Sequence, residues 1–432
     1  MSFVEEMARQ ARRAGRQLAR LGASQRSRLL DDLAAALADD DARTQLLAAN
    51  GRDVEAGRVA AARGELSEAV VRRLVLDESK LDGLCDGLRQ LAGQPEIVGQ
   101  RQVYRELDEG LTLRRVSCPL GLLGVIFESR PDAVPQISGL AIKSGNAVLL
   151  KGGREAAHSN RALVDLLRAV LVRHQIEPTA IGLLEDRAQV NEMLGLRKLI
   201  DLVIARGSSA FVHHIQSHSD IPVMGHAEGL CHLYLDATAD PTMAARIAVD
   251  AKTSYPAACN AIETLLWHPD AGAALDASVA ALQAAGVELR ACQATRERHG
   301  TLLAATDEDW STEYTALILS IRRVDDLDQA LEHIERFGSG HTEVILTADA
   351  THAERFLAEV DAAGVFHNAS SRFADGYRYG LGAEVGISTG KMHARGPVGV
   401  EGLLTYRWLL TGGGHVAGDY GPGKRRFTHR DL

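Results

Sequence analysis

Hydrophobic residues in the first hundred positions recur with the period of an α-helix. The run at residues 2–22 is rich in arginine, but Glu5 and Glu6 argue against a transit peptide. The spacing predicts an amphipathic surface helix whose apolar face carries Val4, Met7, Ala8, Ala11, Ala14 and Leu18. Helical composition continues to about residue 105, so the first quarter of the chain is expected to be almost wholly helical.

From residue 111 the pattern changes to short apolar runs that alternate with helical ones. Such alternation is typical of βαβ units and parallel sheets, and it predicts two α/β domains joined near 235–240. In the first series the strands are expected at 111–118, 122–128, 147–152, 200–207 and 231–236. In the second series we expect helices at 241–253, 271–285 and 325–337 and strands at 262–268, 315–324, 343–349 and 364–369.

Two segments near the C-terminus lack a regular pattern. Residues 376–402 are rich in glycine and also carry Lys, His and Arg, and so long a loop in a compact domain favours a functional role. The last segment, 412–432, is expected to be a poorly packed tail.

Composition narrows the classes of protein. The chain has 432 residues, of which 46% are hydrophobic and 24% charged, as in soluble multidomain proteins. A net charge of −9 argues against non-specific nucleic-acid binding, and no apolar run is long enough to span a bilayer, so a cytoplasmic location is expected. The five cysteines include no C-x-x-C pair, so we expect neither disulfides nor a metal site.

Cys259 is the candidate nucleophile. Pro256 should end the preceding helix and leave a turn that leads into a strand. Ala257, Ala258 and Ala261 are small, so a substrate could approach the sulfur closely. No neighbour in sequence would lower the thiol pKa, and a buried structural cysteine fits the local pattern equally well.

Two glycine turns are candidates for nucleotide contacts. The segments LLKGGRE (149–155) and ARGSS (205–209) each follow a strand and open a helix, where free N–H groups can meet a phosphate. Either segment alone could be a simple turn, whereas two of them in one α/β domain favour a nucleotide site. There is no Walker A motif and no G-x-G-x-x-G motif.

Basic residues gather in the segment 366–397, which takes in most of that glycine-rich stretch and is hereafter the glycine-rich loop. Such a loop either binds carboxylate or phosphate or is simply solvated. A lone histidine such as His341 is more often structural than catalytic. The loop residues are Arg372, Arg378, Lys391, His393 and Arg395.

Four segments together resemble the γ-glutamyl phosphate reductase family, also called glutamate-5-semialdehyde dehydrogenases, of the aldehyde dehydrogenase superfamily. They are GLLGVIFESRPDAVPQISGLAIKSGNAVLLKGG, SYPAACNAIETLLWH, FGSGHTEVILTAD and GLGAEVGISTGKMHARGPVGVEGLLTYRW, and the resemblance runs from about residue 5 to residue 415. It implies an α/β fold with a Rossmann-like NAD(P) domain, an α/β catalytic domain and a small β-hairpin oligomerisation flap. The implied parts are an NADPH-binding domain at 1–107 and 124–235 with part of 370–396, a catalytic domain at 236–369, a flap at 108–123 and 397–415, and a tail at 416–432.

The resemblance also implies a reaction. L-γ-glutamyl 5-phosphate would acylate Cys259, phosphate would leave, and NADPH would reduce the thioester to L-glutamate 5-semialdehyde. Arg154 stands where many NAD-using relatives have a glutamate, which favours NADPH over NADH. Glu228 fits poorly the glutamate that activates water in hydrolytic relatives, in keeping with a reductase.

Further site residues follow from the same resemblance. The implied cofactor-binding residues are Lys151, Arg154, Gly207, Ser208 and Glu313. The implied substrate-binding residues are Arg130, Asn260, His341, Arg372, Lys391 and Arg395, where Arg130 meets either the substrate phosphate or the developing oxyanion. By analogy the protein forms a homo-oligomer, and a glutamate 5-kinase is a candidate partner.

Three alternatives remain open on the sequence. One is another acylating aldehyde dehydrogenase that uses a CoA thioester. Another is a cysteine hydrolase in which Cys259 works with His341 or His393. The third is a non-catalytic nucleotide-binding protein.

Overall fold

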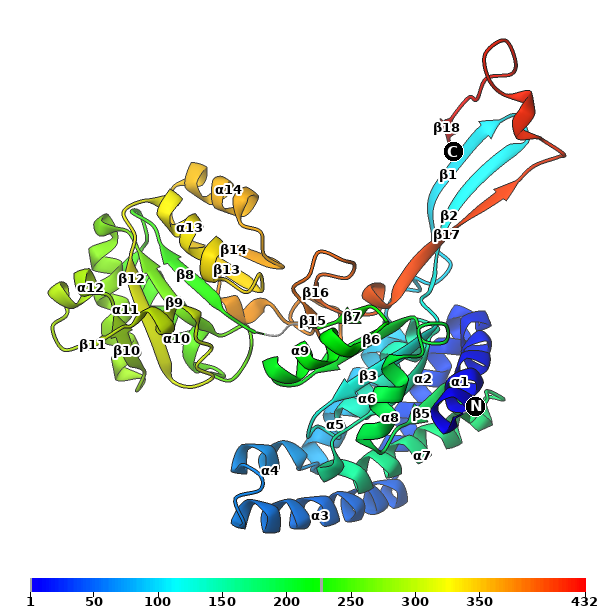
Figure 1. The fold of residues 1–432 in the computed structure, drawn as a ribbon, viewed down its shortest axis with the longest axis horizontal. Helices are drawn as coiled ribbons and strands as arrows, with labels where there is room; N and C mark the ends of the chain where they lie inside the picture. The colour runs from blue at the N-terminus through cyan, green and yellow to red at the C-terminus, as the bar shows by residue number, and fades with distance from the viewer. Residues whose placement is uncertain (1, 226–227) are drawn as a thin grey trace.

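The computed structural model describes residues 2–225 and 228–432, which form two α/β domains and a projecting flap (Figure 1). The three parts are built on separate sheets, and the glycine-rich loop lies between the two domains (Figure 1). Within these ranges no helix is both long enough and apolar enough to cross a membrane.

The first domain has a parallel five-stranded sheet in the order β5-β4-β3-β6-β7. Its central strands are apolar and buried on both faces, as expected for a sheet covered by helices on both sides. The strands are β3 (Leu122–Phe127), β4 (Ala147–Lys151), β5 (Ile181–Leu183), β6 (Leu202–Arg206) and β7 (Val223–Met224). The helices are α1 (Phe3–Arg20), α2 (Ala23–Ala38), α3 (Asp40–Ala62), α4 (Glu68–Leu74), α5 (Glu78–Gly93), α6 (Ala133–Lys143), α7 (Ala157–Arg173), α8 (Arg187–Leu194) and α9 (Ser209–His218).

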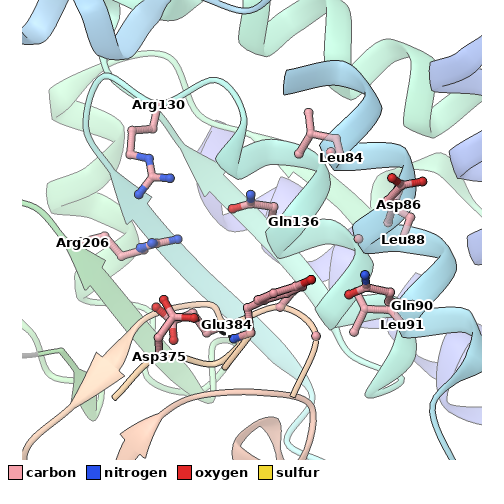
Figure 2. A pocket seen from close by; sticks show the side chains of 15 residues that line it. Leu84, Asp86, Leu88, Gln90, Leu91, Arg130, Gln136, Arg206, Asp375 and Glu384 are labelled. Carbon is pink, nitrogen blue, oxygen red and sulfur yellow. Dashed lines mark hydrogen bonds between the residues drawn. The ribbon is translucent and has the colours of Figure 1, made fainter. Parts of the chain in front are cut away.

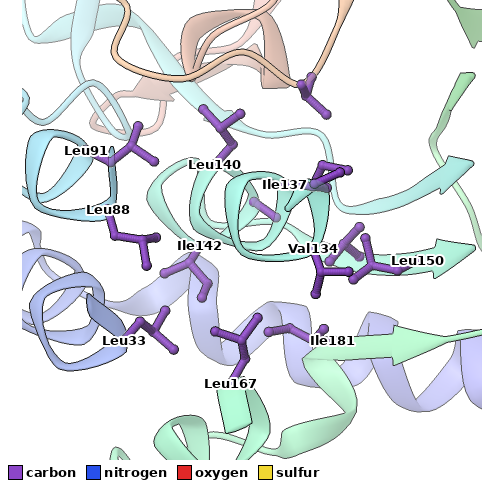
Figure 3. Packing of buried hydrophobic residues seen from close by; sticks show 14 of the residues in the cluster. Leu33, Leu88, Leu91, Val134, Ile137, Leu140, Ile142, Leu150, Leu167 and Ile181 are labelled. Atoms are coloured by element: carbon purple, nitrogen blue, oxygen red, sulfur yellow. The ribbon is translucent and has the colours of Figure 1, made fainter. Parts of the chain in front are cut away.

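Helix α6 runs through the middle of this domain. All but one of its residues are buried, the exception being Gln136, and their side chains meet those of α2, α5, α7 and the sheet (Figure 3). Leu140 and Ile142 lie among leucines of α5 in this packing (Figure 3). Because α6 is enclosed by apolar neighbours, it gives a rigid base to the loop at 128–132 that precedes it.

The second domain has a parallel seven-stranded sheet in the order β11-β10-β12-β9-β8-β13-β14. Its helices are α10 (Pro241–Thr253), α11 (Gly272–Ala284), α12 (Gln293–Arg298), α13 (Leu327–Phe337) and α14 (Ala350–Glu359). Its strands are β8 (Cys231–Leu235), β9 (Ile262–Trp267), β10 (Glu288–Ala291), β11 (Leu303–Ala304), β12 (Ile318–Arg323), β13 (Thr342–Leu346) and β14 (Gly364–His367).

The position of β8 differs from the prediction. The sequence placed residues 231–236 in the first series, whereas β8 pairs with β9 and β13 in the second sheet. The chain therefore crosses between the sheets before residue 231 rather than near 235–240. An apolar run looks the same in either sheet, and only pairing with distant strands decides between them.

The flap is an antiparallel sheet in the order β17-β2-β1-β18. Its strands are β1 (Arg101–Asp108), β2 (Leu111–Pro119), β17 (Leu404–Thr411) and β18 (Arg430–Asp431). The expectation of helix up to residue 105 is wrong over β1, and the hairpin spans 101–119 rather than 108–123. Strand β1 lacks the clean apolar alternation of a half-buried strand, because both of its faces are largely half-exposed.

The C-terminal segment is more ordered than expected. Thr428 N–H donates to the carbonyl of Leu107, and Arg430 and Glu106 form an ion pair at 2.9 Å. The tail thus adds β18 to the outer edge of β1, although its side chains remain largely exposed. Between the domains and the flap lies a short pair of strands, β15 (Ile387–Ser388) and β16 (Gly396–Pro397).

Candidate active site

Cys259 lies in a turn between α10 and β9, as the sequence predicted, and is half-buried. The backbone of this turn packs against Gly229. A Cβ on Gly229 would lie 2.3 Å from the Cys259 carbonyl oxygen and 2.5 Å from its Cα. Only glycine allows so close an approach of the two backbones, so Gly229 fixes the position of the cysteine.

His341 contacts the cysteine directly. Its Nε2 atom lies 3.2 Å from the Cys259 Sγ, and its Nδ1 atom lies 2.8 Å from the Thr342 Oγ1. The imidazole is only 1% exposed. The resemblance implied that His341 binds substrate, and only the hydrolase alternative paired it with Cys259. The structure brings it to the sulfur from a position 82 residues away. No local pattern could reveal that contact.

The surroundings of the sulfur favour the neutral thiol. Burial, followed by the charges of Glu384 and Glu313, raises the pKa of Cys259 to about 12, and Arg372 only partly opposes this. A free thiolate is therefore scarce near neutral pH, so nucleophilic attack requires a base that removes the proton. His341 is in position to do so.

Glu313 lies on the other side of Gly229. Its carboxylate accepts a hydrogen bond from the Gly229 N–H, and burial raises the pKa of Glu313. Its charge also raises the pKa of Cys259. Glu313 is thus close to the sulfur of Cys259, and its contact with a nicotinamide ribose stays a prediction.

Three strands of the first domain bring the predicted nucleotide residues to one edge. Ile126 of β3 is opposite Lys151 of β4, and Phe127 of β3 is opposite Arg206 of β6. The turns that follow β4 and β6 therefore lie on either side of β3 at the carboxyl edge of a parallel sheet, the usual place for a dinucleotide. Gly207 is required there, because a Cβ would lie 2.8 Å from the ring of Phe211.

The residues around Lys151 fit a nucleotide. Lys151 is buried and its Nζ donates to the Gly152 carbonyl at 2.5 Å, while burial lowers its pKa. The carboxylate of Glu155 is held by the N–H and the hydroxyl of Ser129, at 2.9 and 2.5 Å. Arg154 is exposed, and the described residues include no hydrogen-bond or ion-pair partner for it. A cation in this position is open to an anionic group of a bound nucleotide.

Arg206 is a site residue that the sequence reasoning missed. It precedes Gly207 in the ARGSS turn, where attention fell on the glycine and the serine. Its Nη1 atom is buried without a hydrogen-bond partner in the described part of the chain. Burial and the charge of Arg130 lower its pKa to about 10. Arg130 itself is half-exposed and pairs with Asp132 at 2.9 Å.

The remaining substrate candidates separate into two groups. Asn260 donates to the Ala374 carbonyl at 2.8 Å and so ties the cysteine turn to the glycine-rich loop. Arg372 donates to the Ser254 hydroxyl at 3.0 Å and interacts electrostatically with the cysteine. Lys391 and Arg395 both pair with Asp361, the second at 2.8 Å, and no contact of theirs with Cys259 is seen among the described residues. Their substrate role stays a prediction.

The chain resembles known proteins over nearly its whole length, although no family model matches it. A γ-glutamyl phosphate reductase from a Synechococcus sp. is 54% identical over 424 residues, which cover 98% of this chain and 95% of that protein. A γ-glutamyl phosphate reductase from a Cyanothece sp. is 54% identical over 431 residues, which cover 99% of this chain and 98% of that protein. The chain belongs to the γ-glutamyl phosphate reductase family.

Solved structures agree with this membership of the γ-glutamyl phosphate reductase family. The crystal structure of γ-glutamyl phosphate reductase from Thermotoga maritima superposes with a TM-score of 0.92 at 38% identity, covering 96% of this chain and all of that one. An acetylating aldehyde dehydrogenase from Geobacillus thermoglucosidasius has a TM-score of 0.67 at 18% identity, covers 96% of this chain and 97% of that one, and shows a common fold only. The predicted α/β, aldehyde dehydrogenase-like fold is confirmed.

Proposed function

We propose that this protein reduces L-γ-glutamyl 5-phosphate to L-glutamate 5-semialdehyde and releases phosphate, the second step of proline biosynthesis from glutamate. The observation that carries the proposal is the 3.2 Å contact between His341 and Cys259 in a member of the γ-glutamyl phosphate reductase family. Acyl phosphates are activated for attack by sulfur because phosphate is a good leaving group.

The first half of the reaction uses Cys259 and His341. As the sulfur attacks the acyl carbon, His341 Nε2 takes the thiol proton, a carbon–sulfur bond forms and the bond to the phosphate oxygen breaks. The phosphate leaves with its electron pair, and a thioester remains on Cys259. The hydrogen bond from the histidine's other nitrogen to Thr342 holds the imidazole in the orientation that this transfer requires.

The cofactor is proposed to be NADPH. Lys151, Arg154, Gly207, Ser208 and Glu313 would hold it, with Arg154 beside the group that distinguishes NADPH from NADH. When bound, NADPH supplies the hydride that brings the acyl carbon to the aldehyde level. The carbon–sulfur bond then breaks and the aldehyde leaves. The proton that His341 took from the thiol goes to the released phosphate, and Cys259 takes a new proton from solvent, so that one proton is consumed in each turnover.

The experiment is the reverse reaction with glutamate semialdehyde, phosphate and NADP⁺, followed at the absorbance of the reduced nicotinamide. Phosphate-dependent turnover that Cys259→Ala abolishes is expected. Turnover that needs CoA in place of phosphate would instead favour the CoA-dependent alternative. Hydrolysis of an ester or thioester without any nucleotide would favour the cysteine hydrolase.

The family resemblance carries three further proposals. The protein works as a homo-oligomer, it acts in the cytoplasm, and it takes its unstable substrate from a glutamate 5-kinase. Size-exclusion chromatography with light scattering tests the first, and co-purification with the kinase tests the last.

A further inference from the structure

A polar cavity of about 500 Å³ lies between the first domain and the glycine-rich loop (Figure 2). Its walls come from α5, the start of α6, the end of β6 and the glycine-rich loop. Two of its lining residues, Arg206 and Glu384, also interact electrostatically with Cys259. The cavity therefore reaches the neighbourhood of the reacting sulfur.

Two guanidinium groups extend into the cavity. Figure 2 shows Arg206 reaching in from the end of β6 and Arg130 reaching in from the loop before α6. Asp132 is a partner for Arg130, but the buried Nη1 of Arg206 has none in the part of the chain that the structure describes. A buried, charged donor without a partner is costly, and an anionic oxygen of a ligand would satisfy it.

Two carboxyl groups lie near the arginines, on the glycine-rich loop. Figure 2 shows Asp375 and Glu384 close together below Arg206. Glu384 accepts a hydrogen bond from the Gly376 N–H at 2.7 Å, which fixes its position, and burial raises its pKa. A wall that carries both signs of charge suits a zwitterion better than a simple anion or an apolar aldehyde.

We infer that this cavity binds the α-amino-acid head group of the substrate, an inference that rests on the proposed function. Arg206, with Arg130, binds the α-carboxylate, while Glu384, with Asp375, binds the α-ammonium. In a γ-glutamyl group three carbon–carbon bonds separate the α-carbon from the reacting carbonyl, a span of about 4 Å. The head group must then lie close to Cys259, and this cavity reaches that neighbourhood through Arg206 and Glu384.

The wall that α5 forms, which also carries Asp86, leaves room for that head group. Gly83 and Gly87 lie one turn apart on α5 and line the cavity. A Cβ built on either glycine meets nothing within 4 Å. A side chain can therefore be added at Gly87 to fill the cavity without a clash with the backbone.

The test uses three aldehydes in the reverse assay with phosphate and NADP⁺. Glutamate 5-semialdehyde carries both charges, 5-oxopentanoate carries only the carboxylate, and pentanal carries neither. For each variant we take the ratio of kcat/KM between two aldehydes and compare these ratios among variants. Glutamate semialdehyde partly closes to a ring in solution, but the open fraction is the same for every variant and so cancels. Arg206→Gln is expected to lower the preference for the two carboxylates over pentanal by about 10- to 100-fold. Glu384→Gln is expected to lower the preference for glutamate semialdehyde over 5-oxopentanoate by a similar factor.

Two variants give independent checks. Gly87→Trp should raise the KM for glutamate semialdehyde at least tenfold, whereas Gly51→Trp, at an equally open position of α3, should not. Arg323→Gln is the charge control, since Arg323 lies at the surface and pairs with Asp325. If Arg206→Gln slows all three aldehydes equally, Arg206 acts on the sulfur alone and the inference is wrong.

A binding measurement separates this inference from the proposed reaction. Calorimetric titration with L-glutamate and with glutarate needs no turnover. If the wild-type protein binds L-glutamate more tightly than glutarate and Glu384→Gln removes that difference, the head-group site stands even if the reverse reaction is not observed. If both ligands bind equally, or neither binds, the inference fails, even in an enzyme that turns over.

Discussion

The Nε2 atom of His341 lies 3.2 Å from the Sγ of Cys259, at the point where β13 begins and the turn before β9 ends. In the proposed reaction this pair joins a base to a nucleophile, and the surroundings of the nucleophile keep it protonated. Replacement of the base should therefore affect formation of the thioester more than binding of either substrate.

His341→Asn should lower kcat by about 10²- to 10⁴-fold, the usual contribution of a general base, with little change in KM. Because burial and two carboxylates raise the pKa of Cys259 to about 12, alkylation of the variant's thiol by iodoacetamide should be slow at pH 7 and should rise steadily with pH. The wild-type thiol should react faster near neutral pH. His174→Asn, distant in sequence and paired with Asp32, is the control. Equal alkylation rates at pH 7 would contradict the assignment of His341.

Gly229→Ala should inactivate the enzyme without unfolding it. The new Cβ would lie 2.3 to 2.7 Å from three backbone atoms of Cys259, so the turn must move. A displacement of that size at the reacting atom costs about 10²-fold in kcat. Gly51→Ala lies on α3 with nothing near its Cβ, and it should keep full activity while gaining about 0.5–1 kcal/mol of stability. Thermal unfolding and kcat of both variants check the prediction.

Lys252 and Glu263 form a buried ion pair at 2.5 Å beneath the cysteine turn. Lys252→Met should lower the free energy of unfolding by about 3–5 kcal/mol, because it leaves a buried carboxylate without its partner. Lys252→Met with Glu263→Gln should recover much of that loss. Arg355→Met, which breaks the exposed pairs with Asp328 and Glu359, should cost no more than about 1 kcal/mol for each pair.

The loss in Lys252→Met should also depend on pH. Burial raises the pKa of Glu263 from its ordinary 4.5 to about 7 even with the lysine present. The folded state therefore binds this proton more tightly than the unfolded chain does, and stability falls as pH rises above 4.5. Without the lysine, the decrease in the free energy of unfolding with pH should steepen toward about 1.4 kcal/mol per pH unit. Denaturant titrations at pH 5, 6 and 7 measure this slope, and a flat profile would show that Glu263 ionises freely in the fold.

Arg154→Glu should reduce the preference for NADPH over NADH by about 10- to 100-fold, because an exposed cation is replaced by a charge that repels a phosphate. The nearby Glu155 cannot compensate, since Ser129 holds its carboxylate. Arg52→Glu, on the surface of α3, makes the same charge change elsewhere. If both variants keep the wild-type ratio of kcat/KM with NADPH to kcat/KM with NADH, another residue discriminates between the two cofactors.

Much of the fold was predictable because its strands are continuous apolar runs bounded by turns. The expected helix at 241–253 matches α10 in full, and Pro256 does mark the turn that carries Cys259. The sequence could not assign β8 to its sheet or detect β1. Both depend on pairing with strands far along the chain, and β1 has no apolar face of its own.

Residues of the candidate site were predictable only where they lie together in one turn of the sequence. Cys259, Lys151 and Gly207 each follow from a local pattern of strand, turn and helix. Arg206 and the contact of His341 with the sulfur do not, because each depends on which loops meet in space. The family resemblance named His341 as a substrate-binding residue, and the pairing with Cys259 entered only through the hydrolase alternative.

The flap also has a consequence for synthesis of the chain. Strand β2 at 111–119 pairs along its length with β17 at 404–411, and Asn146 donates to the carbonyl of Leu403. During translation, the hairpin and the first sheet emerge long before their last partner leaves the ribosome. For most of that time β2 presents an unpaired edge, so nascent chains that stall before residue 404 should be the species that chaperones must shield.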